Sequence, residues 1–332
     1  MEKLRVALIG CGSISNNHII PLSENDKVTL VALCDIVREK AEAKLIEHSL
    51  SLPIYTDYVE MLDKENLDAV HIATPHYLHA EMTIEALKRN INVFLEKPMC
   101  ISPRECEIML AAEKASKGRV CVCFQNRFNH STLFAKRLIA EDGGATSGYG
   151  ALFWNRGERY YARDAWRGKK ATEGGGVMIN QAIHTIDLLY DLFGTPKQVC
   201  ATVSNHSLKG VIDVEDSAEG VIYFDEGRQA NFYATNSFRG ISNNYVYVTT
   251  KNHKIEIRLN HLYLDGERID DDEGNIPVMG KEVYGTSHMK LIDLFYSAIL
   301  SGDPMPIPME SAQYPVRIIC ASYNSFDTPT DV

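Results

Sequence analysis

The sequence lacks a surplus of basic residues. Among its 332 residues, 34 lysines and arginines stand against 44 aspartates and glutamates, which gives a formal net charge of -10 at pH 7. Proteins that bind nucleic acids or anionic membranes attract them with positive charge. The composition therefore argues against both partners, and small molecules are the expected ligands.

Long apolar runs are also missing. A transmembrane helix needs roughly 20 consecutive apolar residues, and no segment of this sequence approaches that length. The first residues, MEKLRVALIG, lead directly into a strand-like segment and lack the layout of a signal peptide. We expect no membrane partner and a cytoplasmic protein.

Paired CxxC spacings are absent among the eight cysteines. Most of the cysteines lie inside apolar segments, as small buried hydrophobes do in a reducing compartment. Cys121 and Cys123 form a CxC, but this lies in an apolar run and no second pair accompanies it. The sequence therefore predicts no metal site.

The length predicts two domains, because single cores usually stop growing at about 250 to 300 residues. Short apolar runs alternate with helix-like segments over residues 1–124, for example LRVALIG, VTLVALCD, LDAVHIAT and INVFLEKP. This alternation is typical of βαβ units around a parallel sheet. We predict an α/β fold whose N-terminal domain, 1–124, is a Rossmann-type doubly wound parallel sheet of six strands.

The pattern changes in residues 125–332. A helix over 177–193, closed by Gly194 and Pro196, is followed by strand-like runs from KQVCATVS to HLYLDGERI. Consecutive strands joined by turns such as Asp265-Gly266 indicate a largely antiparallel sheet. Two helical segments end the chain, HMKLIDLFYSAILSG and SAQYPVRIICASYNSF, and we expect the last helices to pack back on the first domain.

A glycine turn follows the first predicted strand. Gly10 permits the tight turn, and Gly12 lets the backbone approach a pyrophosphate at the N-terminus of the next helix, although Ser15 replaces the third glycine of the dinucleotide fingerprint. An ordinary glycine turn is the alternative. The second strand ends at Asp35, whose carboxylate can accept both ribose hydroxyls and repel a 2′-phosphate. NAD is therefore favoured as the cofactor, and Arg38 nearby leaves NADP possible.

Two loops leave the carboxyl ends of the fourth and fifth predicted strands, where open α/β sheets bind their ligands. The first carries Thr74-Pro75 and the second Glu96-Lys97-Pro98. A lysine at such a place is commonly a solvated surface charge. Pro98, however, restricts the backbone of the preceding residue and so determines where Lys97 points.

The helix within GGGVMINQAIHTIDLLYDLFG, residues 174–194, is apolar over most of its circumference. At 100° per residue, a single narrow stripe holds its polar side chains, Asn180, His184, Asp187 and Asp191. A helix apolar on most sides is buried. The stripe therefore faces either a strip of solvent or an enclosed cleft.

Several ordered motifs together resemble one family, that of glucose-fructose oxidoreductase, inositol dehydrogenase and the rhizopine catabolism protein MocA (Gfo/Idh/MocA). In chain order they are Gly10-x-Gly12, Asp35, Ala73-Thr74-Pro75, Glu96-Lys97-Pro98, Trp166-Arg167-Gly168, Gly174-Gly175-Gly176 and Asn180-x-x-x-His184-x-x-Asp187. The resemblance covers essentially the whole chain. It implies a Rossmann domain, a C-terminal α/β domain with a large open sheet, an active site between them, and nicotinamide-dependent oxidation or reduction of sugars and cyclitols. It also implies a homodimer or homotetramer formed through the C-terminal sheet.

The resemblance assigns roles to individual residues. His184 would take the proton of the substrate hydroxyl, Lys97 would stabilise the developing alkoxide, and Asn180 would orient the substrate. Asp187 could orient the imidazole or be only a helix surface charge. The expected cofactor-binding residues are Gly10, Gly12, Ser13, Ile14, Asp35, Thr74, Pro75, His79, Glu96, Lys97, Trp166 and Arg167.

The wall of the substrate pocket is expected to include aromatic side chains, which suit the C–H faces of a sugar ring. The candidates for this wall are Tyr160, Tyr161, Trp166 and Arg167, with core packing as the alternative for the two tyrosines. Asn126 and Arg127 follow the sixth strand and are weaker substrate candidates. Arg127 has a second interpretation as a buried structural partner between domains.

One position departs from the family pattern. Inositol-type members carry aspartate where this chain has Asn180, and an asparagine can orient a hydroxyl but cannot accept its proton. The asparagine leaves the identity of the substrate open. From the resemblance as a whole we predict an NAD-dependent dehydrogenase whose substrate is a sugar, a sugar derivative or a cyclitol. An NAD-dependent glycosidase and a dinucleotide-sensing regulatory protein are the alternatives.

Overall fold

The chain forms two compact units in the computed structural model, which describes residues 3–240, 243–269, 287–326 and 328–332. The first unit contains the described residues up to Cys100 together with Arg104–Cys123 and His288–Ser311. The second contains Ile101–Pro103, the described residues between Phe124 and Ser287, and Ala312–Val332. The segment His288–Ser311 returns to the first unit, so neither unit is continuous in sequence.

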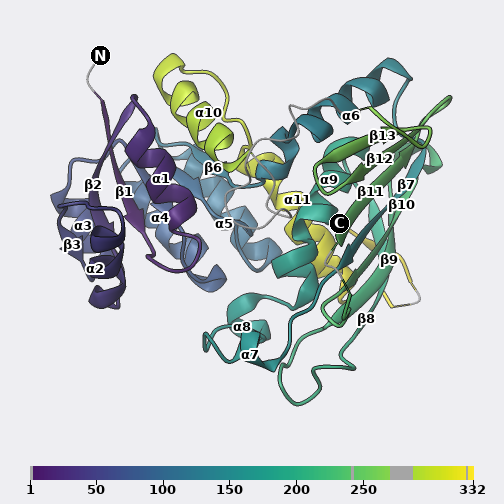
Figure 1. Ribbon diagram of the computed structural model, residues 1–332, viewed down its shortest axis with the longest axis horizontal. Helices are drawn as coiled ribbons and strands as arrows, with labels where there is room; N and C mark the ends of the chain where they lie inside the picture. The colour runs from purple at the N-terminus through teal and green to yellow at the C-terminus, as the bar shows by residue number, and fades with distance from the viewer. Residues whose placement is uncertain (1–2, 241–242, 270–286, 327) are drawn as a thin grey trace. The chain divides into compact units, whose positions relative to one another are not determined.

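The first unit contains a six-stranded parallel sheet in the order β3-β2-β1-β4-β5-β6 (Figure 1). Two parallel halves start from β1 and β4, which lie side by side in the middle of the sheet, as in a doubly wound fold. The Rossmann prediction is confirmed. The strands are β1 (Leu4–Ile9), β2 (Val28–Cys34), β3 (Ile54–Tyr55), β4 (Ala69–Ile72), β5 (Asn92–Leu95) and β6 (Val120–Val122).

Helices connect these strands and bury the sheet. The strands β1, β4, β5 and β6 are almost wholly buried, which explains why they appear in the sequence as continuous apolar runs. The helices are α1 (Asn16–Glu24), α2 (Arg38–Glu47), α3 (Tyr58–Lys64), η1 (His76–Leu78), α4 (His79–Lys88), α5 (Pro103–Lys114) and α10 (His288–Ser301).

Helix α10 comes from the far end of the chain and packs on α1 and β5. Asp293 of α10 accepts hydrogen bonds from Lys27 Nζ at 2.5 Å and from Asn25 Nδ2 at 3.0 Å. These contacts attach the returning segment to the start of the Rossmann sheet.

The second unit contains a nine-stranded sheet in the order β14-β13-β12-β11-β7-β10-β9-β8-β15 (Figure 1). It is mostly antiparallel, as predicted; β7 and β10 are its parallel pair. Strand β7 was not predicted, because two glycines in SGYGALF weaken the alternating pattern. The strands are β7 (Ser147–Phe153), β8 (Gln198–Ser204), β9 (Ser217–Tyr223), β10 (Gln229–Thr235), β11 (Asn243–Thr249), β12 (Lys254–Arg258), β13 (His261–Leu264), β14 (Glu267–Arg268) and β15 (Thr330–Asp331).

Helices cover one part of this sheet: α9 contacts β7 and β11, and α6 contacts β12 and β13. The predicted helix 177–193 is not a single regular α-helix, since a π-helical turn over Met178–Ala182 precedes α9. The helices of this unit are η2 (Gln125–Phe128), α6 (His130–Glu141), α7 (Glu158–Tyr161), α8 (Lys170–Glu173), η3 (Met178–Ala182), α9 (Ile183–Phe193), the short η4 (Asp225–Gly227) and most of α11 (Met309–Ser322).

The predicted character of the cysteines is confirmed. Six of the eight are buried and two are partly buried, and none of the eight forms a disulfide bond. Among the described residues, no helix combines the length and the apolar character needed to cross a membrane.

Candidate active site in two half-sites

The glycine turn after β1 is held by Asp35. Its Oδ2 accepts a hydrogen bond from the backbone N–H of Cys11 at 2.8 Å, and its Oδ1 accepts one from Val37 N–H at 2.9 Å. Gly10 adopts φ +98°, and a Cβ there would lie 2.4 Å from the carbonyl oxygen of Ala73. The structure therefore joins two predicted cofactor-binding features, the glycine turn and the carboxylate, in one hydrogen-bonded unit.

The turn leaves room beside Gly12. A Cβ built on Gly12 would meet no protein atom within 4 Å, so the backbone is open to a ligand at this point. Ser13 is exposed and Ile14 partly exposed, just before the N-terminus of α1. Ser15, which replaces the third glycine, is buried and donates to the carbonyl of Gly12 at 2.7 Å. These features fit a pyrophosphate held by backbone N–H groups at a helix N-terminus.

His79 joins the two loops that leave β4 and β5. Its Nδ1 lies 2.6 Å from the carbonyl oxygen of Pro98, and its Nε2 lies 2.9 Å from that of Thr74. The ring is fully buried, and burial lowers its pKa. Thr74 and Pro75 remain partly exposed at the loop surface. The structure thus places His79 behind the loop surface, where it holds the loops in position.

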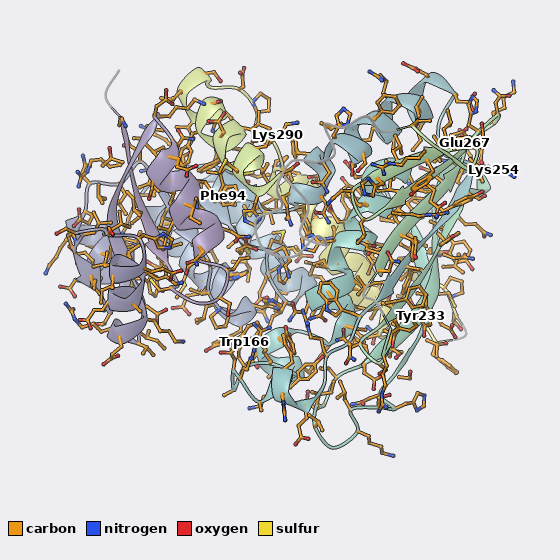
Figure 2. All side chains as sticks on the ribbon, viewed as in Figure 1. Phe94, Trp166, Tyr233, Lys254, Glu267 and Lys290 are labelled. Carbon is orange, nitrogen blue, oxygen red and sulfur yellow. The ribbon has the colours of Figure 1, made fainter. Side chains whose placement is uncertain are left out.

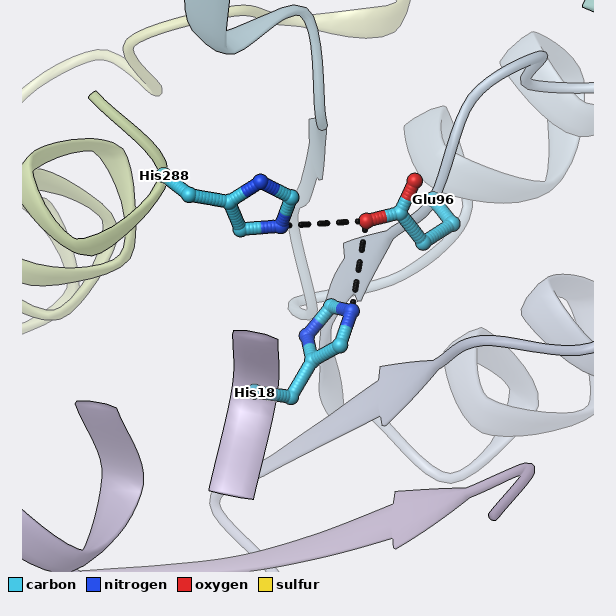
Figure 3. A group of neighbouring side chains, drawn as sticks. All are labelled: His18, Glu96 and His288. Carbon is cyan, nitrogen blue, oxygen red and sulfur yellow. Dashed lines mark ion pairs between the residues drawn. The ribbon is translucent and has the colours of Figure 1, made fainter. Parts of the chain in front are cut away.

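Lys97 and Glu96 follow β5 and lie in different surroundings. Lys97 is partly exposed, whereas Glu96 is buried, and its Oε2 accepts from the backbone N–H of Lys97 at 3.3 Å. The other carboxylate oxygen of Glu96 lies 3.2 Å from Nε2 of the buried His18 and 3.1 Å from Nε2 of the buried His288 (Figure 3). The backbone at Lys97 is therefore fixed by a buried neighbour while its side chain reaches the surface of the first unit.

The second unit carries the predicted polar stripe. His184 is partly exposed, and its ring meets Phe124 edge to face with centroids 6.0 Å apart. Asp187, one turn further, is buried and is bound by both sides of the Arg127 guanidinium, from Nε at 2.9 Å and from Nη2 at 2.5 Å. Arg127 had two interpretations, a substrate-binding residue and a buried structural partner. Its geometry is that of a structural ion pair, and both members of the pair belong to the second unit. Asp187 contacts Arg127 rather than being a surface charge.

Asn180 belongs to a polar cluster that we call the Tyr160 cluster, composed of Tyr160, Arg167, Glu173 and Asn180. The Asn180 amide donates to a carboxylate oxygen of Glu173 and, at 3.2 Å, to the Tyr160 hydroxyl. Arg167 Nη1 donates to the same hydroxyl at 2.6 Å. Because a carboxylate only accepts, the contact with Glu173 determines which way the amide of Asn180 is turned.

The remaining candidates of the second unit differ in burial. Trp166, labelled in Figure 2 beside α7 and α8, is partly exposed, and the Arg167 guanidinium lies 4.4 Å from its ring centroid. Tyr161 is buried in a core cluster with Leu208, Ile212 and Val214. This burial favours a role for Tyr161 in core packing over a role in the wall of the substrate pocket. Asn126 is buried and lines a small pocket that also includes Asn129 and Asn260.

Glu173 was missed by the sequence analysis. It is 1% exposed, it accepts from the Asn180 amide, and its other oxygen accepts from the backbone N–H of Gly168. A glutamate directly before three glycines resembles an ordinary charged loop residue. The only available signal was its place between two motifs, Trp166-Arg167-Gly168 and the glycine triplet, which must lie close together if both serve one site.

Comparisons with known proteins match both parts of the chain to one family of oxidoreductases. Residues 4–124 match the family described as "Oxidoreductase family, NAD-binding Rossmann fold", and residues 135–256 match the "GFO/IDH/MocA C-terminal domain". The two matched regions together make up more than half of the chain. The N-terminal unit is therefore an NAD-binding Rossmann domain.

Curated relatives include dehydrogenases of sugars and cyclitols. Inositol 2-dehydrogenase of Salmonella typhimurium (strain LT2) is 30% identical over 138 residues, 41% of this chain and 41% of the relative, so the match spans about two fifths of that protein. Levoglucosan dehydrogenase of Pseudarthrobacter phenanthrenivorans is 26% identical over 298 residues, 77% of this chain and 73% of the relative. D-xylose 1-dehydrogenase (NADP(+)) 2 of Haloferax volcanii is 25% identical over 327 residues and 97% of each chain.

Among solved structures, the WlbA dehydrogenase from Bordetella pertussis, in complex with NADH and UDP-GlcNAcA, aligns with a TM-score of 0.87 and 24% identity over 100% of this chain and 99% of that one. Levoglucosan dehydrogenase in complex with NADH aligns with a TM-score of 0.88 and 21% identity, over 100% and 99% of the chains. At these identities the likeness establishes the fold.

Proposed function

Because the chain belongs to the GFO/IDH/MocA family of oxidoreductases, we propose that it transfers a hydride between NAD and a secondary alcohol or ketone of a sugar, a sugar derivative or a cyclitol. The observation that carries this proposal is the exposure of His184. On a helix whose other members are mostly buried, His184 is partly exposed, and the neighbouring carboxylate of Asp187 is bound to Arg127. A partly exposed histidine on a helix suits a general base.

The first half-site would hold the cofactor. Backbone N–H groups near Gly12, Ser13 and Ile14 would bind the pyrophosphate, and the Asp35 carboxylate would accept the ribose hydroxyls. We place further residues near the cofactor, namely Thr74, Pro75, His79, Glu96, Trp166 and Arg167. Of these, His79 and Glu96 are buried and would support the loops that contact it. NAD, when bound, supplies the hydride acceptor.

The protein's own groups would move the proton. In the oxidation direction His184 would remove the proton of the substrate hydroxyl, and the ammonium group of Lys97 would hydrogen-bond the same oxygen and stabilise its developing negative charge. In reduction His184 would return the proton. We propose that both residues act on one substrate atom, although they come from different half-sites.

Asn180 would orient the substrate without taking its proton. Its amide donates to Glu173 and Tyr160, which fixes the orientation of the side chain, and its carbonyl oxygen would accept a hydrogen bond from a substrate hydroxyl. Tyr160, Asn126 and Arg127 complete the proposed substrate set, the last by holding α9 through Asp187. Tyr161 would support them from the core.

A spectrophotometric screen tests this function. Purified protein is incubated with NAD or NADP and with aldoses, inositols, uronic acids or nucleotide sugars, and the formation of the reduced cofactor is followed by absorbance. We expect turnover with at least one class and with NAD preferred to NADP. Release of reducing sugar without net formation of NADH would identify a glycosidase instead. Cofactor binding without turnover of any substrate would indicate a sensing protein.

We also propose that copies of the chain associate through the nine-stranded sheet. Tyr149 lies on β7 and is 42% exposed, and Tyr233 (Figure 2) lies on the adjacent strand β10 and is 39% exposed. Tyr149 stacks on Tyr247 with centroids 5.3 Å apart. Exposed, ordered aromatic surface of this kind is typical of interfaces between proteins. Light scattering coupled to size exclusion measures the assembly, and Tyr233→Glu is expected to shift it towards the monomer.

A further inference from the structure

Arg156 lies beside the Tyr160 cluster, just after β7 in the second unit. Its backbone is fixed by a hydrogen bond of 2.9 Å from its N–H to the carbonyl oxygen of Asn236. Its guanidinium carbon lies 4.6 Å from the ring centroid of Trp154 and 4.6 Å from that of Tyr160, and the residue is partly exposed. Contacts with two aromatic rings therefore hold the guanidinium in place.

The charge of Arg156 is not neutralised by the part of the chain that the structure describes. Its guanidinium forms no hydrogen bond or ion pair with any described residue; Nε is buried without an acceptor, and the two terminal nitrogens are open to solvent. The neighbouring Arg167 differs, since it donates from Nε to Asp164 at 3.0 Å and from Nη1 to the Tyr160 hydroxyl at 2.6 Å. Aromatic rings attract a cation but do not cancel its charge. Arg156 thus retains donors for an anionic ligand.

The Tyr160 side chain connects Arg156 to the proposed substrate site. Its ring contacts the guanidinium of Arg156, and its hydroxyl accepts a hydrogen bond from the Asn180 amide at 3.2 Å. The charge of Arg156 and the residue proposed to orient the substrate are therefore separated by no more than one tyrosine side chain. A substituent on a sugar ring held by Asn180 can reach across such a distance.

Positive charge is concentrated in the segment around Arg156. Residues 156–170, RGERYYARDAWRGKK, contain six basic residues and two acidic ones, although the whole chain has a formal net charge of -10. Arg159 and Arg163 of this segment are exposed and form no ion pair with any described residue. A local excess of one charge raises the concentration of oppositely charged ligands near it and speeds their association. The segment therefore favours an anionic ligand in a protein that is acidic overall.

We propose that the substrate is an anionic derivative of a sugar or cyclitol and that Arg156 binds its carboxylate or phosphate group. This inference rests on the proposed function, because it places the substrate beside Asn180. The two terminal nitrogens of a guanidinium form a planar fork that matches two oxygens of a carboxylate or a phosphate. A neutral sugar offers only hydroxyl oxygens to this fork and gains less from its charge.

The experiment measures binding to the full chain by calorimetry in the presence of NADH, so that no alcohol is oxidised. D-glucose is the neutral probe, D-glucuronate adds a carboxylate, D-glucose 6-phosphate adds a phosphate and UDP-glucose adds a diphosphate; the corresponding galactose derivatives are measured in parallel. We expect at least one anionic probe to bind about tenfold or more tightly than its neutral sugar. The anionic probe that binds most tightly identifies the charged group. Neutral sugars that bind as tightly as every anionic probe would overturn the proposal.

Arg156→Gln separates anion recognition from a structural role. The variant should bind the best anionic probe about 10- to 100-fold more weakly, as expected for the loss of a charge-assisted contact, and should bind the neutral sugar as the wild type does. The matched control is Arg163→Gln, which removes an exposed charge from the same segment and should change both affinities far less. An equal loss for neutral and anionic probes in Arg156→Gln would mean a structural arginine. An equal loss for the anion in both variants would mean that only the overall charge matters. Either result would overturn the proposal.

A measurement on the wild type covers the case in which Arg156→Gln does not fold. Raising NaCl from about 20 to about 300 mM screens charges and should weaken binding of the anionic probe several-fold while binding of the neutral sugar is unchanged. Binding of the anion that does not depend on salt would contradict the proposal.

The outcomes also separate this inference from the proposed function. Anion binding that depends on Arg156, without turnover of any substrate with NAD, would support the anion site and refute the dehydrogenase. Turnover that is fastest with a neutral sugar and equal in wild type and Arg156→Gln would support the dehydrogenase and refute the anion site.

Discussion

Arg127 binds Asp187 through two parallel hydrogen bonds, with Nε at 2.9 Å from Oδ2 and Nη2 at 2.5 Å from Oδ1. Burial raises the pKa of the Asp187 carboxyl to about 6, even though the charge of Arg127 acts in the opposite direction. The pair connects η2 to α9, the helix that carries His184. The buried ion pair therefore helps to hold the helix that carries the proposed base in place.

Removing one partner of this pair should destabilise the second unit strongly. In Arg127→Met the Asp187 carboxylate stays buried without its countercharge, and we expect a loss of about 3 to 5 kcal/mol in the free energy of unfolding. The double variant Arg127→Met/Asp187→Leu should recover most of that loss, because no uncompensated charge remains. Urea unfolding measures both. A single variant that unfolds like the wild type would contradict the structural role.

His184 should be needed for turnover and dispensable for cofactor binding. We expect kcat of His184→Ala to fall on the order of 10² to 10⁴-fold, the usual contribution of a general base, while the Kd for NADH is unchanged. The wild-type oxidation rate should show an ionisation in its pH profile that the variant lacks. Asp191→Asn is the control, since it alters the same helix at a residue paired with Lys136 at 2.9 Å. Equal rates in wild type and His184→Ala would exclude the base role.

Lys97 should affect the rate more than the fold. Its side chain is partly exposed, so Lys97→Ala leaves the packing of the first unit intact, and loss of one oxyanion donor lowers kcat by about 10² to 10³-fold. Lys88→Ala removes an exposed lysine of α4 and serves as the control. Thermal unfolding of each protein separates the two effects. A large drop in Tm with Lys97→Ala would identify a structural lysine.

Asp35 should determine both cofactor choice and the shape of the glycine turn. Asp35→Ser removes the acceptor of the ribose hydroxyls and the repulsion of a 2′-phosphate. The variant should therefore bind NAD more weakly than the wild type, and its affinities for NAD and NADP should differ less. Asp35→Asn retains one oxygen acceptor for the backbone N–H groups of Cys11 and Val37, so it should be the more stable of the two variants. Titration of both cofactors into each protein tests this. Tighter binding of NADP than of NAD by the wild type would refute the assignment.

Glu113 should make stability depend on pH. Burial raises the pKa of its carboxyl from 4.5 to about 7, against the hydrogen bond from Val120 N–H, and Glu310 adds to the rise. Between about pH 4.5 and 7 the folded state therefore binds more protons than the unfolded state, so stability falls as the pH rises. Because Glu113 is only partly buried, the effect should not exceed about 1 kcal/mol.

The matched variant for this prediction is Glu113→Gln, which keeps an oxygen for the Val120 N–H but cannot ionise. Its unfolding free energy should exceed that of the wild type at pH 8, and the difference should shrink at pH 5. Unfolding curves at both values give the comparison. A difference that does not change with pH would mean that Glu113 does not titrate in this range.

Features that arise within a short stretch of chain were predictable. The apolar strands of the Rossmann sheet follow from runs such as INVFLEKP, because a strand buried on both faces is apolar throughout. The turn at Gly10 follows from the one residue type that tolerates φ +98° next to the Ala73 carbonyl. The order of the motifs along the chain was also sufficient to indicate the family.

The sequence by itself determined most of the strands, the glycine turn and the helix that carries His184, because each depends on neighbours a few positions away, and the order of its motifs indicated the candidate residues. Only the tertiary structure decided which polar groups meet. Arg127 and Asp187 are 60 positions apart, and Cys123 and His288 are 165 apart. Even the π-helical turn before α9 was invisible to a periodicity of 3.6 residues. Burial turns these distant pairs into obligatory partners, since a charge or a lone pair withdrawn from water must be compensated by whatever the fold places beside it.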